Sequence, residues 1–157
     1  MDVCQEGLKA FHGTDRRFEY KGSIGGVTII DDYAHHPTEI KATLQAAKRY
    51  PANSIWCVFQ PHTYTRTKAF LDDFADALAL ADHIVLTDIY AAREVNPGDI
   101  HSRDILERLK KHGKDAYYFP TFGEIQDFLL ENCTNGDLLI TMGAGDVVSI
   151  GESLLGL

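Results

Sequence analysis

Short apolar runs alternate with segments of helical periodicity along most of the chain, and this alternation restricts the fold more than any other feature. Strand-like runs occupy residues 27–30, 54–59, 83–86, 116–119 and 138–141. The run at 54–59, SIWCVF, is apolar almost throughout, which is typical of a strand buried on both faces. Parallel strands need long crossover connections, which are usually helices. The pattern therefore predicts an α/β protein with a three-layer, Rossmann-like fold, in which helices cover both faces of a mostly parallel sheet of about six strands.

The connections between these runs carry the signals of turns and helices. Residues 17–20 and 27–30 are joined by KGSIGG, which predicts an antiparallel hairpin at one edge of the sheet. Helices are expected at 37–50, at 66–81, from a Ser102 cap to about His112, from a capping box of Thr121 and Glu124, and after the turn Gly143-Ala144-Gly145. No repeat or linker divides the chain. Residues 1–12, with a short helix, are expected to be the tail of a preceding domain, and 13–157 to form one domain.

Composition narrows the possible partners and location. The formal net charge of −8 argues against a nucleic acid or an acidic membrane surface as partner. No apolar run approaches the roughly 18 residues of a membrane span, and the start, MDVCQEG, has no signal-peptide pattern. The cysteines, Cys4, Cys57 and Cys133, are widely spaced, as in proteins that keep free thiols in a reducing compartment. We therefore expect a cytoplasmic protein that binds neither membrane nor nucleic acid.

Three polar loops follow predicted parallel strands: DDYAHHP at 31–37, QPHTYTR at 60–66 and TDIYAARE at 87–94. Because the carboxyl ends of parallel strands lie at one edge of a sheet, these loops should meet there, where ligands bind in such folds. The side chains they offer are Asp31, Asp32, Tyr33, His35, His36, His62, Tyr64, Arg66, Arg93 and Glu94.

The residues alone do not assign catalysis to this edge. His35, His36 and His62 with Asp31 or Asp32 are suitable metal-ligand types, but their spacing favours hydrogen-bonded turn residues, so we assign no metal. The turn at 143–145 lacks the third glycine of a dinucleotide fingerprint, because Val148 stands there. No GxxxxGK[ST] occurs, so an ATP-gripping loop would have to lie elsewhere, and we assign no certain catalytic residue.

Four segments, in order, give the chain a specific resemblance: GTDRRFEYKG at 13–22, DDYAHHPTEI at 31–40, FQPHTYTRT at 59–67 and TMGAGD at 141–146. The AARE at 91–94 agrees with them. On these segments the chain resembles the C-terminal domain of the Mur ligases, and among them the members that add L-alanine. The resemblance spans nearly the whole chain.

The resemblance implies a three-domain enzyme of peptidoglycan precursor synthesis. In such an enzyme an N-terminal domain holds UDP-N-acetylmuramate. A central domain makes most of the contacts with ATP and Mg²⁺. The C-terminal domain brings L-alanine and closes over ATP. ATP activates the muramyl carboxylate as an acyl phosphate, which the amine of L-alanine then attacks. An isolated C-terminal domain is expected to be inactive.

Residue by residue, the resemblance places Arg17 and Asp32 at the nucleotide, with Tyr33 and His35 beside it. It places His62 and Arg66 where the amino acid is received. These types suit the roles, because arginine grips phosphate or carboxylate with paired hydrogen bonds and an ionised aspartate accepts from ribose hydroxyls. One departure is Thr63, where the family usually has arginine.

Two alternatives remain open from the sequence. The first is the related ligase that recycles whole peptides onto the same sugar, although its second loop should not read QPHxYTR. The second is a stand-alone binding module that has kept the fold and lost catalysis, which Thr63 and the missing phosphate loop would favour. The choice of alanine or tripeptide as acceptor separates the first alternative, and the sequence upstream of Met1 separates the second.

Overall fold

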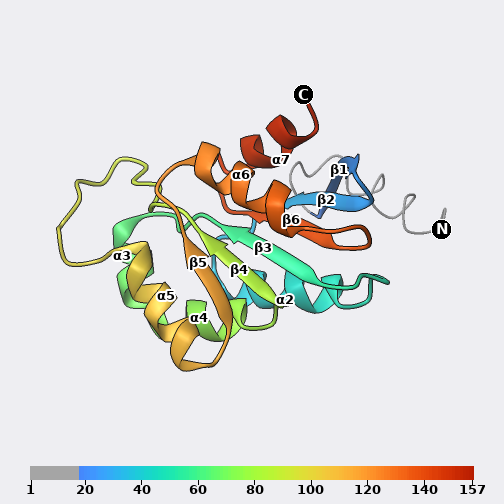
Figure 1. Cartoon of the computed structure of the whole chain (residues 1–157). Helices are drawn as coiled ribbons and strands as arrows, with labels where there is room; N and C mark the ends of the chain where they lie inside the picture. Colours follow the sequence, from blue (N-terminus) through green and yellow to red (C-terminus); the bar gives the residue numbers. More distant parts are fainter. Residues whose placement is uncertain (1–17) are drawn as a thin grey trace.

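The computed structural model of the chain, which describes residues 18–157, is built on a six-stranded sheet (Figure 1). The strands are β1 (Glu19–Ile24), β2 (Val27–Asp32), β3 (Ile55–Phe59), β4 (His83–Leu86), β5 (Asp115–Tyr118) and β6 (Leu138–Met142), in the order β1-β2-β6-β3-β4-β5. Only β1 and β2 pair antiparallel; all other neighbours are parallel. The predicted sheet and its edge hairpin are therefore confirmed. The expected tail at 1–12, its helix and Arg17 lie outside the described residues.

Helices cover both faces of this sheet, as predicted. They are α2 (Pro37–Ala47), α3 (Tyr64–Ala69), α4 (Leu71–Leu78), α5 (Ser102–Lys111), α6 (Phe122–Asn132) and α7 (Val148–Leu154). In Figure 1, α2, α4 and α5 lie on one face and α6 and α7 on the other. Successive residues of β3 feed the two cores, because Cys57 packs with the α2–α4–α5 core and Val58 with the α6–α7 core. Every residue of β3 and β6 is buried.

The insertion of β6 between β2 and β3 creates the point at which the connections change face. The chain leaves β3 toward α3 and α4, but it leaves β6 toward α7 on the opposite face (Figure 1). In open α/β sheets the crevice at such a point, outside the carboxyl ends of the strands, is where ligands bind. The fold therefore places a candidate site at the ends of β6 and β3 and of their neighbours.

The helix predicted at 66–81 is wrong in two respects, because it starts earlier and is broken. Phe70, with φ −118° and ψ 30°, separates α3 from α4, although no proline or glycine is present. The reason is a competition between partners. Phe74 and Leu78 draw α4 into the core, where both are fully buried, whereas α3 is held at its start by polar contacts at the edge of the sheet.

The predicted Ser102 cap is also wrong. His101 caps α5, because its Nδ1 accepts from the N–H of Arg103 at 3.0 Å. The hydroxyl of Ser102 is buried and instead donates to the carbonyl of Thr87 at 2.5 Å. Thr121 does cap α6, with its hydroxyl oxygen accepting from the N–H of Glu124 at 3.3 Å.

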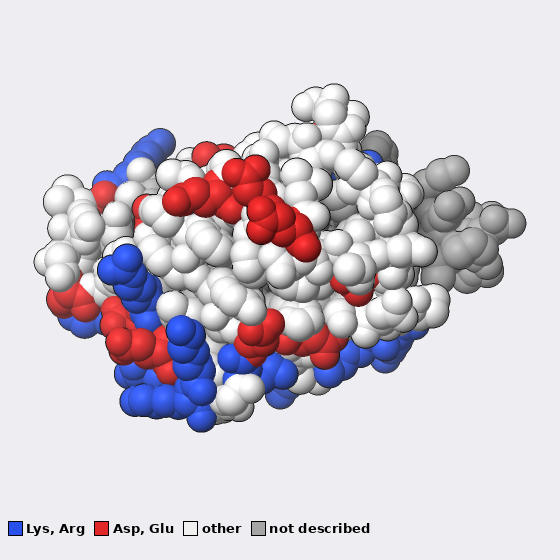
Figure 2. All heavy atoms as spheres, viewed as in Figure 1, with Lys and Arg blue, Asp and Glu red and all other residues white. Residues whose placement is uncertain are grey.

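The surface carries charge of both signs. On the face seen in Figure 2, acidic side chains gather over α6, whose sequence FGEIQDFLLEN has no lysine or arginine. Around α5 basic and acidic side chains are interspersed, as its sequence SRDILERLKK requires. Over residues 18–157, none of the helices has the length and apolar character needed to traverse a lipid bilayer.

Candidate functional site

The polar loops predicted to converge do so at the carboxyl ends of β2, β6, β3 and β4. We call this surface the rim and define it as residues 31–37, 60–66, 87–94 and 143–146. Contacts between aromatic rings join its loops. The ring centroid of His62 lies 5.5 Å from that of His35, and the His62 ring stacks on Tyr90 with a centroid distance of 5.6 Å and an interplanar angle of 16°. Gln60, after β3, donates from Nε2 to Asp146 Oδ1 at 2.9 Å. The four loops therefore form one continuous surface.

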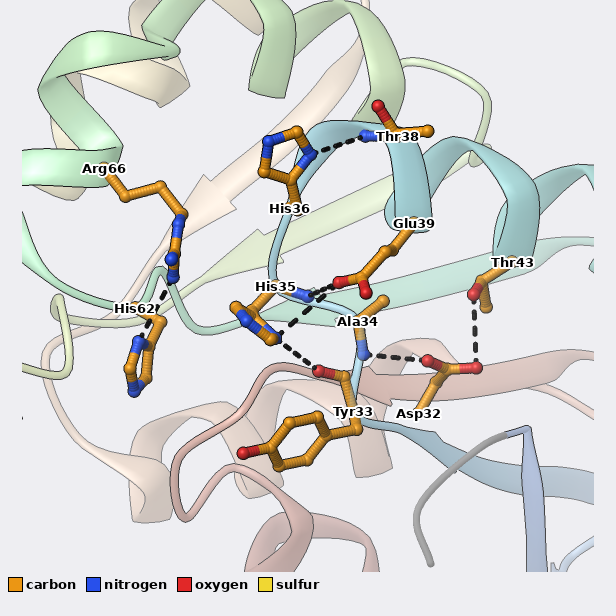
Figure 3. A network of polar contacts seen from close by, with 10 residues as sticks. All are labelled: Asp32, Tyr33, Ala34, His35, His36, Thr38, Glu39, Thr43, His62 and Arg66. Atoms are coloured by element: carbon orange, nitrogen blue, oxygen red, sulfur yellow. Dashed lines mark hydrogen bonds and ion pairs between the residues drawn. The ribbon is translucent and has the colours of Figure 1, made fainter. Parts of the chain in front are cut away.

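Asp32, at the end of β2, is a buried acceptor that ties three segments together. Its Oδ1 accepts from the N–H of Ala34 at 2.8 Å, within the turn. Its Oδ2 accepts from the Thr43 hydroxyl of α2 at 3.1 Å (Figure 3). The same Oδ2 also accepts from the N–H of Phe18 at 2.9 Å. Asp32 thus has a clear structural role, and its role toward a nucleotide stays a prediction.

Asp31 points the other way and serves the sheet. It is fully buried, and its Oδ1 accepts from the hydroxyl of Thr141, on the neighbouring strand β6, at 2.7 Å. The two adjacent carboxylates therefore contact opposite sides of the sheet, because successive side chains of a strand point to opposite faces. Asp31 is not part of the open surface of the rim.

Tyr33 and His35 lie between the Asp32 end of the rim and the Arg66 end (Figure 3). The Tyr33 side chain is 43% exposed, and its ring meets His35 edge-on at 5.3 Å. The Nδ1 of His35 lies 3.1 Å from the Tyr33 carbonyl and 3.7 Å from Glu39 Oε1. Their position beside a nucleotide stays a prediction of the resemblance.

His36 turns away from the rim and acts locally. Its Nδ1 accepts from the N–H of Thr38 at 3.3 Å, which caps α2, and its ring packs against Phe70 at 5.1 Å. The candidate metal set that includes His36 is therefore not assembled. Within residues 18–157, no three His, Cys, Asp or Glu side chains are placed to share a metal ion.

His62 and Arg66 form the opposite, cationic end of the rim. They are one turn apart, and Arg66 Nη1 lies 3.5 Å from His62 Nδ1 (Figure 3). Within the described part of the chain, Arg66 has no carboxylate within 4 Å. Partial burial lowers the pKa of His62, and the nearby His35 and Arg66 lower it further, against the opposing effect of Glu94. His62 is therefore neutral near pH 7, so Arg66 and not His62 is the cation at this end of the rim.

Thr63 stands where the resemblance leads us to expect an arginine. Its hydroxyl oxygen accepts from the N–H of Arg66 at 3.2 Å and caps α3. Its backbone has φ 67° and ψ 146°, a conformation that a β-branched residue rarely adopts. The side chain therefore points back to the helix and not into the open rim.

A pocket lies on the Asp32 side of the rim. Its volume is about 250 Å³, and Asp32, Tyr33, Glu39 and Thr43 are among its lining residues. Hydroxyl and carboxylate groups of this kind match the hydrogen bonds that a ribose can make. The predicted nucleotide residues Asp32 and Tyr33 thus share one cavity, whereas His62 and Arg66 lie outside its lining.

Sequence reasoning gave no role to Gln60, Tyr90 or the backbone of 143–145. Gln60 is buried at the crevice between β3 and β6, where its Oε1 also accepts from the N–H of Val147 at 3.2 Å. Gly145 is required there, because an added Cβ would lie 2.4 Å from Gln60 Oε1 and 2.7 Å from Tyr90. A polar residue directly after a fully apolar strand was the available signal for Gln60; nothing local marked Tyr90.

Fold and rim together define the class: a Rossmann-like α/β domain with a ligand surface at its strand ends, carrying an acceptor-lined pocket and a cationic end. The chain belongs to the Mur ligase family, because residues 16–145 match the family model described as Mur ligase, glutamate ligase domain.

Within this family, the chain is similar to ligases named for L-alanine. The chain is 70% identical over 155 residues to a UDP-N-acetylmuramate–L-alanine ligase of Lachnoclostridium phytofermentans, covering 99% of this chain and 33% of that protein. It is similar to the crystal structure of a UDP-N-acetylmuramate-alanine ligase of Thermotoga maritima, with a TM-score of 0.70 and 31% identity over 90% of this chain and 29% of the other. The chain therefore spans about a third of the length of such relatives.

The domain is also similar to one that has been crystallised by itself. The fold matches a crystallised domain of a putative UDP-N-acetylmuramate:L-alanyl-gamma-D-glutamyl-meso-diaminopimelate ligase of Haemophilus ducreyi, with a TM-score of 0.68 and 24% identity. The match covers 89% of this chain and 98% of that one. At this identity the comparison shows the fold alone.

Proposed function

We propose that this chain is the C-terminal domain of an ATP-dependent ligase that adds L-alanine to UDP-N-acetylmuramate through an acyl phosphate. Residues 13–157 form the domain, which receives the amino acid and closes over ATP held mainly by a central domain. The observation that carries the proposal is the division of the rim into an acceptor-lined pocket at Asp32 and a cationic end, where Arg66 lies beside His62. The names and identities of the relatives support the choice of substrates.

The nucleotide side consists of Arg17, Asp32, Tyr33 and His35. The buried Asp32 presents a carboxylate already oriented by Ala34 and Thr43, so little reorganisation is needed to accept from a ribose hydroxyl. Tyr33 offers an exposed ring beside the pocket. ATP, when bound, supplies the phosphoryl group that activates the carboxylate of the sugar.

The amino-acid side consists of His62 and Arg66. An arginine keeps its charge at any physiological pH and can hold the carboxylate of alanine with two parallel hydrogen bonds. Because His62 beside it is neutral, it adds no second positive charge that would repel the amino group of alanine. Positioning of this kind, together with exclusion of water on closure, protects an acyl phosphate until the amine attacks.

Magnesium is assigned to the central domain and not to this chain. Among the described residues, no three His, Cys, Asp or Glu side chains are placed to share a metal ion. The ion would neutralise the phosphates when bound, while the contribution of this domain is orientation.

Acceptor choice tests the proposal. The full-length protein that carries this sequence, given ATP, Mg²⁺ and UDP-N-acetylmuramate, should release ADP in an L-alanine-dependent reaction, and L-alanine should be a better acceptor than the tripeptide L-alanyl-γ-D-glutamyl-meso-diaminopimelate. Preference for the tripeptide would instead indicate the peptide-recycling ligase. Failure with every acceptor would indicate a binding module.

A further inference from the structure

The long connection between β4 and α5 touches the amino-acid side of the rim through Tyr90 and Glu94. Tyr90 stacks on His62, and its backbone continues the pairing of β3 and β4 past their ends. Its N–H donates to the Pro61 carbonyl and its carbonyl accepts from the N–H of Thr63, both at 2.8 Å. The loop is therefore fixed against the segment that leads into α3.

Glu94 grips the start of α3 with both carboxylate oxygens. Its Oε1 accepts from the N–H of Tyr64 at 2.6 Å and of Thr65 at 3.1 Å. Its Oε2 accepts from the Thr65 hydroxyl at 2.6 Å. These N–H groups have no partner within the helix, so the carboxylate satisfies donors that would otherwise need water. The hydrogen bond from the Thr65 hydroxyl is the main reason why the pKa of Glu94 lies below its ordinary value.

Apart from Glu94, the contacts that hold α3 are the Thr63 cap and an ion pair between Lys68 and Asp99 near its other end. Of its six residues only Thr67 is buried, and the helix ends at the non-helical Phe70. A short helix is marginal without outside contacts. The caps from Glu94 and Thr63 therefore determine where its first turn, which carries Arg66, points.

The loop is also shaped to deliver Glu94. Ala92 has φ 57°, in the left-handed region that residues other than glycine seldom adopt. The turn closes with the N–H of Glu94 donating to the Ala91 carbonyl at 2.9 Å. Such a conformation persists where surrounding contacts offset its cost. This loop makes several of them, through Glu94 to the start of α3, through Tyr90 to Thr63 and through Asp99 to Lys68.

We propose that Glu94 is a positioning residue for the acceptor amino acid: by clamping the first turn of α3, it holds Arg66 and His62 in the geometry that receives the carboxylate. This role rests on the function proposed above. Glu94 itself does not contact the substrate; it acts through α3.

Kinetics of the full-length protein carrying Glu94→Ala, Glu94→Gln and Glu94→Asp test the role. Glu94→Ala should raise the KM for L-alanine about tenfold or more, because small displacements of a binding group are costly, while the KM for ATP stays within about twofold. Glu94→Gln keeps an oxygen for the two N–H groups and should restore most of the affinity, whereas the shorter Glu94→Asp should not. Glu131→Ala, the same change of charge at an exposed site on α6, is the matched control and should behave as the unaltered protein.

Amide hydrogen exchange of the 157-residue chain gives a readout that does not depend on activity. In Glu94→Ala the amides of Tyr64 and Thr65 should exchange faster, while those of β3 do not change. An unchanged KM for L-alanine in Glu94→Ala would overturn the role, and so would an equal rise of all KM values or unchanged exchange at Tyr64 and Thr65. If the unaltered protein ligates no alanine, the proposed function fails, and the exchange result still decides whether the clamp exists.

Discussion

At the scale of single residues, neighbouring polar groups of the rim face different directions and make different contacts. Asp31 serves the sheet and Asp32 the pocket; His36 caps a helix while His35 faces the rim. The sequence DDYAHHP shows which groups are present, but alternation along β2 and the start of α2 decide which of them are exposed to a ligand. The same holds for Thr63, whose hydroxyl is used within α3.

The ionisation of His62 is a first prediction at this scale. Its pKa, measured by NMR titration of the 157-residue chain, should lie below the value of about 6.5 typical of a free histidine. Arg66→Gln should raise it and Glu94→Gln should lower it, because the first change removes a positive neighbour and the second a negative one. The peptide QPHTYTR is the unfolded reference. A pKa in the protein at or above that of the peptide would contradict the prediction.

The sign of the stability effect follows from the same shift. The folded chain binds the His62 proton more weakly than the unfolded chain, so the free energy of unfolding contains a term that is present above the unfolded pKa. That term is lost as the pH falls from about 6.5 through the lower folded pKa. His62→Gln should remove this part of the pH dependence in urea unfolding at pH 5 to 7; an unaltered slope would exclude it.

The strained backbone of Thr63 gives a second prediction. Thr63→Ala loses the cap and should destabilise the chain by about 1 kcal/mol, whereas Thr63→Gly loses the cap but gains from the relaxed positive φ. Thr121, which caps α6 at an ordinary φ of −123°, is the matched control. The Ala-to-Gly gain measured by urea unfolding should be larger at 63 than at 121 by about 1 kcal/mol. Equal gains at both positions would show that Thr63 carries no strain.

At the scale of elements, the sequence predicted which helices and strands form better than it predicted where they end or which strands lie next to one another. All five apolar runs became strands and the hairpin formed, because burial on both faces of a parallel sheet leaves an unmistakable apolar signature. The order of strands could not be predicted, since the insertion of β6 between β2 and β3 depends on distant packing. The break at Phe70 was missed for the same reason: it reflects opposing demands of the core and the rim, and no local residue marks it.

The role of Asp32 as a tie between elements gives a third prediction. Because Asp32 joins β2, α2 and the start of β1, Asp32→Ala should lower the free energy of unfolding by about 1 to 3 kcal/mol. Thr43→Val removes one of the three hydrogen bonds while keeping the shape and should cost about 1 kcal/mol. Urea unfolding of the 157-residue chain measures both. If Asp32→Ala lowered the free energy of unfolding no more than Thr43→Val, the hydrogen bonds of Asp32 with Ala34 and Phe18 would contribute nothing to stability.

At the scale of the whole molecule, residues 18–157 have two cores, one on each face of a single sheet, and a rim at the strand ends. A domain of this fold has been crystallised separately, so we expect the 157-residue chain to unfold in one cooperative transition. With no phosphate-binding loop in its sequence, the chain alone should not hydrolyse ATP in the presence of Mg²⁺. ADP release measures this, and sustained turnover by the pure chain would refute the roles assigned here.

The central claim is that one rim has two separable sides, with the nucleotide at Asp32 and the amino acid at Arg66. The most direct test is to measure the KM for ATP and the KM for L-alanine in the full-length protein with Arg66→Ala, and again with Arg17→Ala and Asp32→Asn. Arg66→Ala should raise the KM for L-alanine about tenfold or more with little change for ATP, and the other two should raise the KM for ATP selectively. If Arg66→Ala left the KM for L-alanine unchanged, or raised both values equally, the two-sided rim would be contradicted.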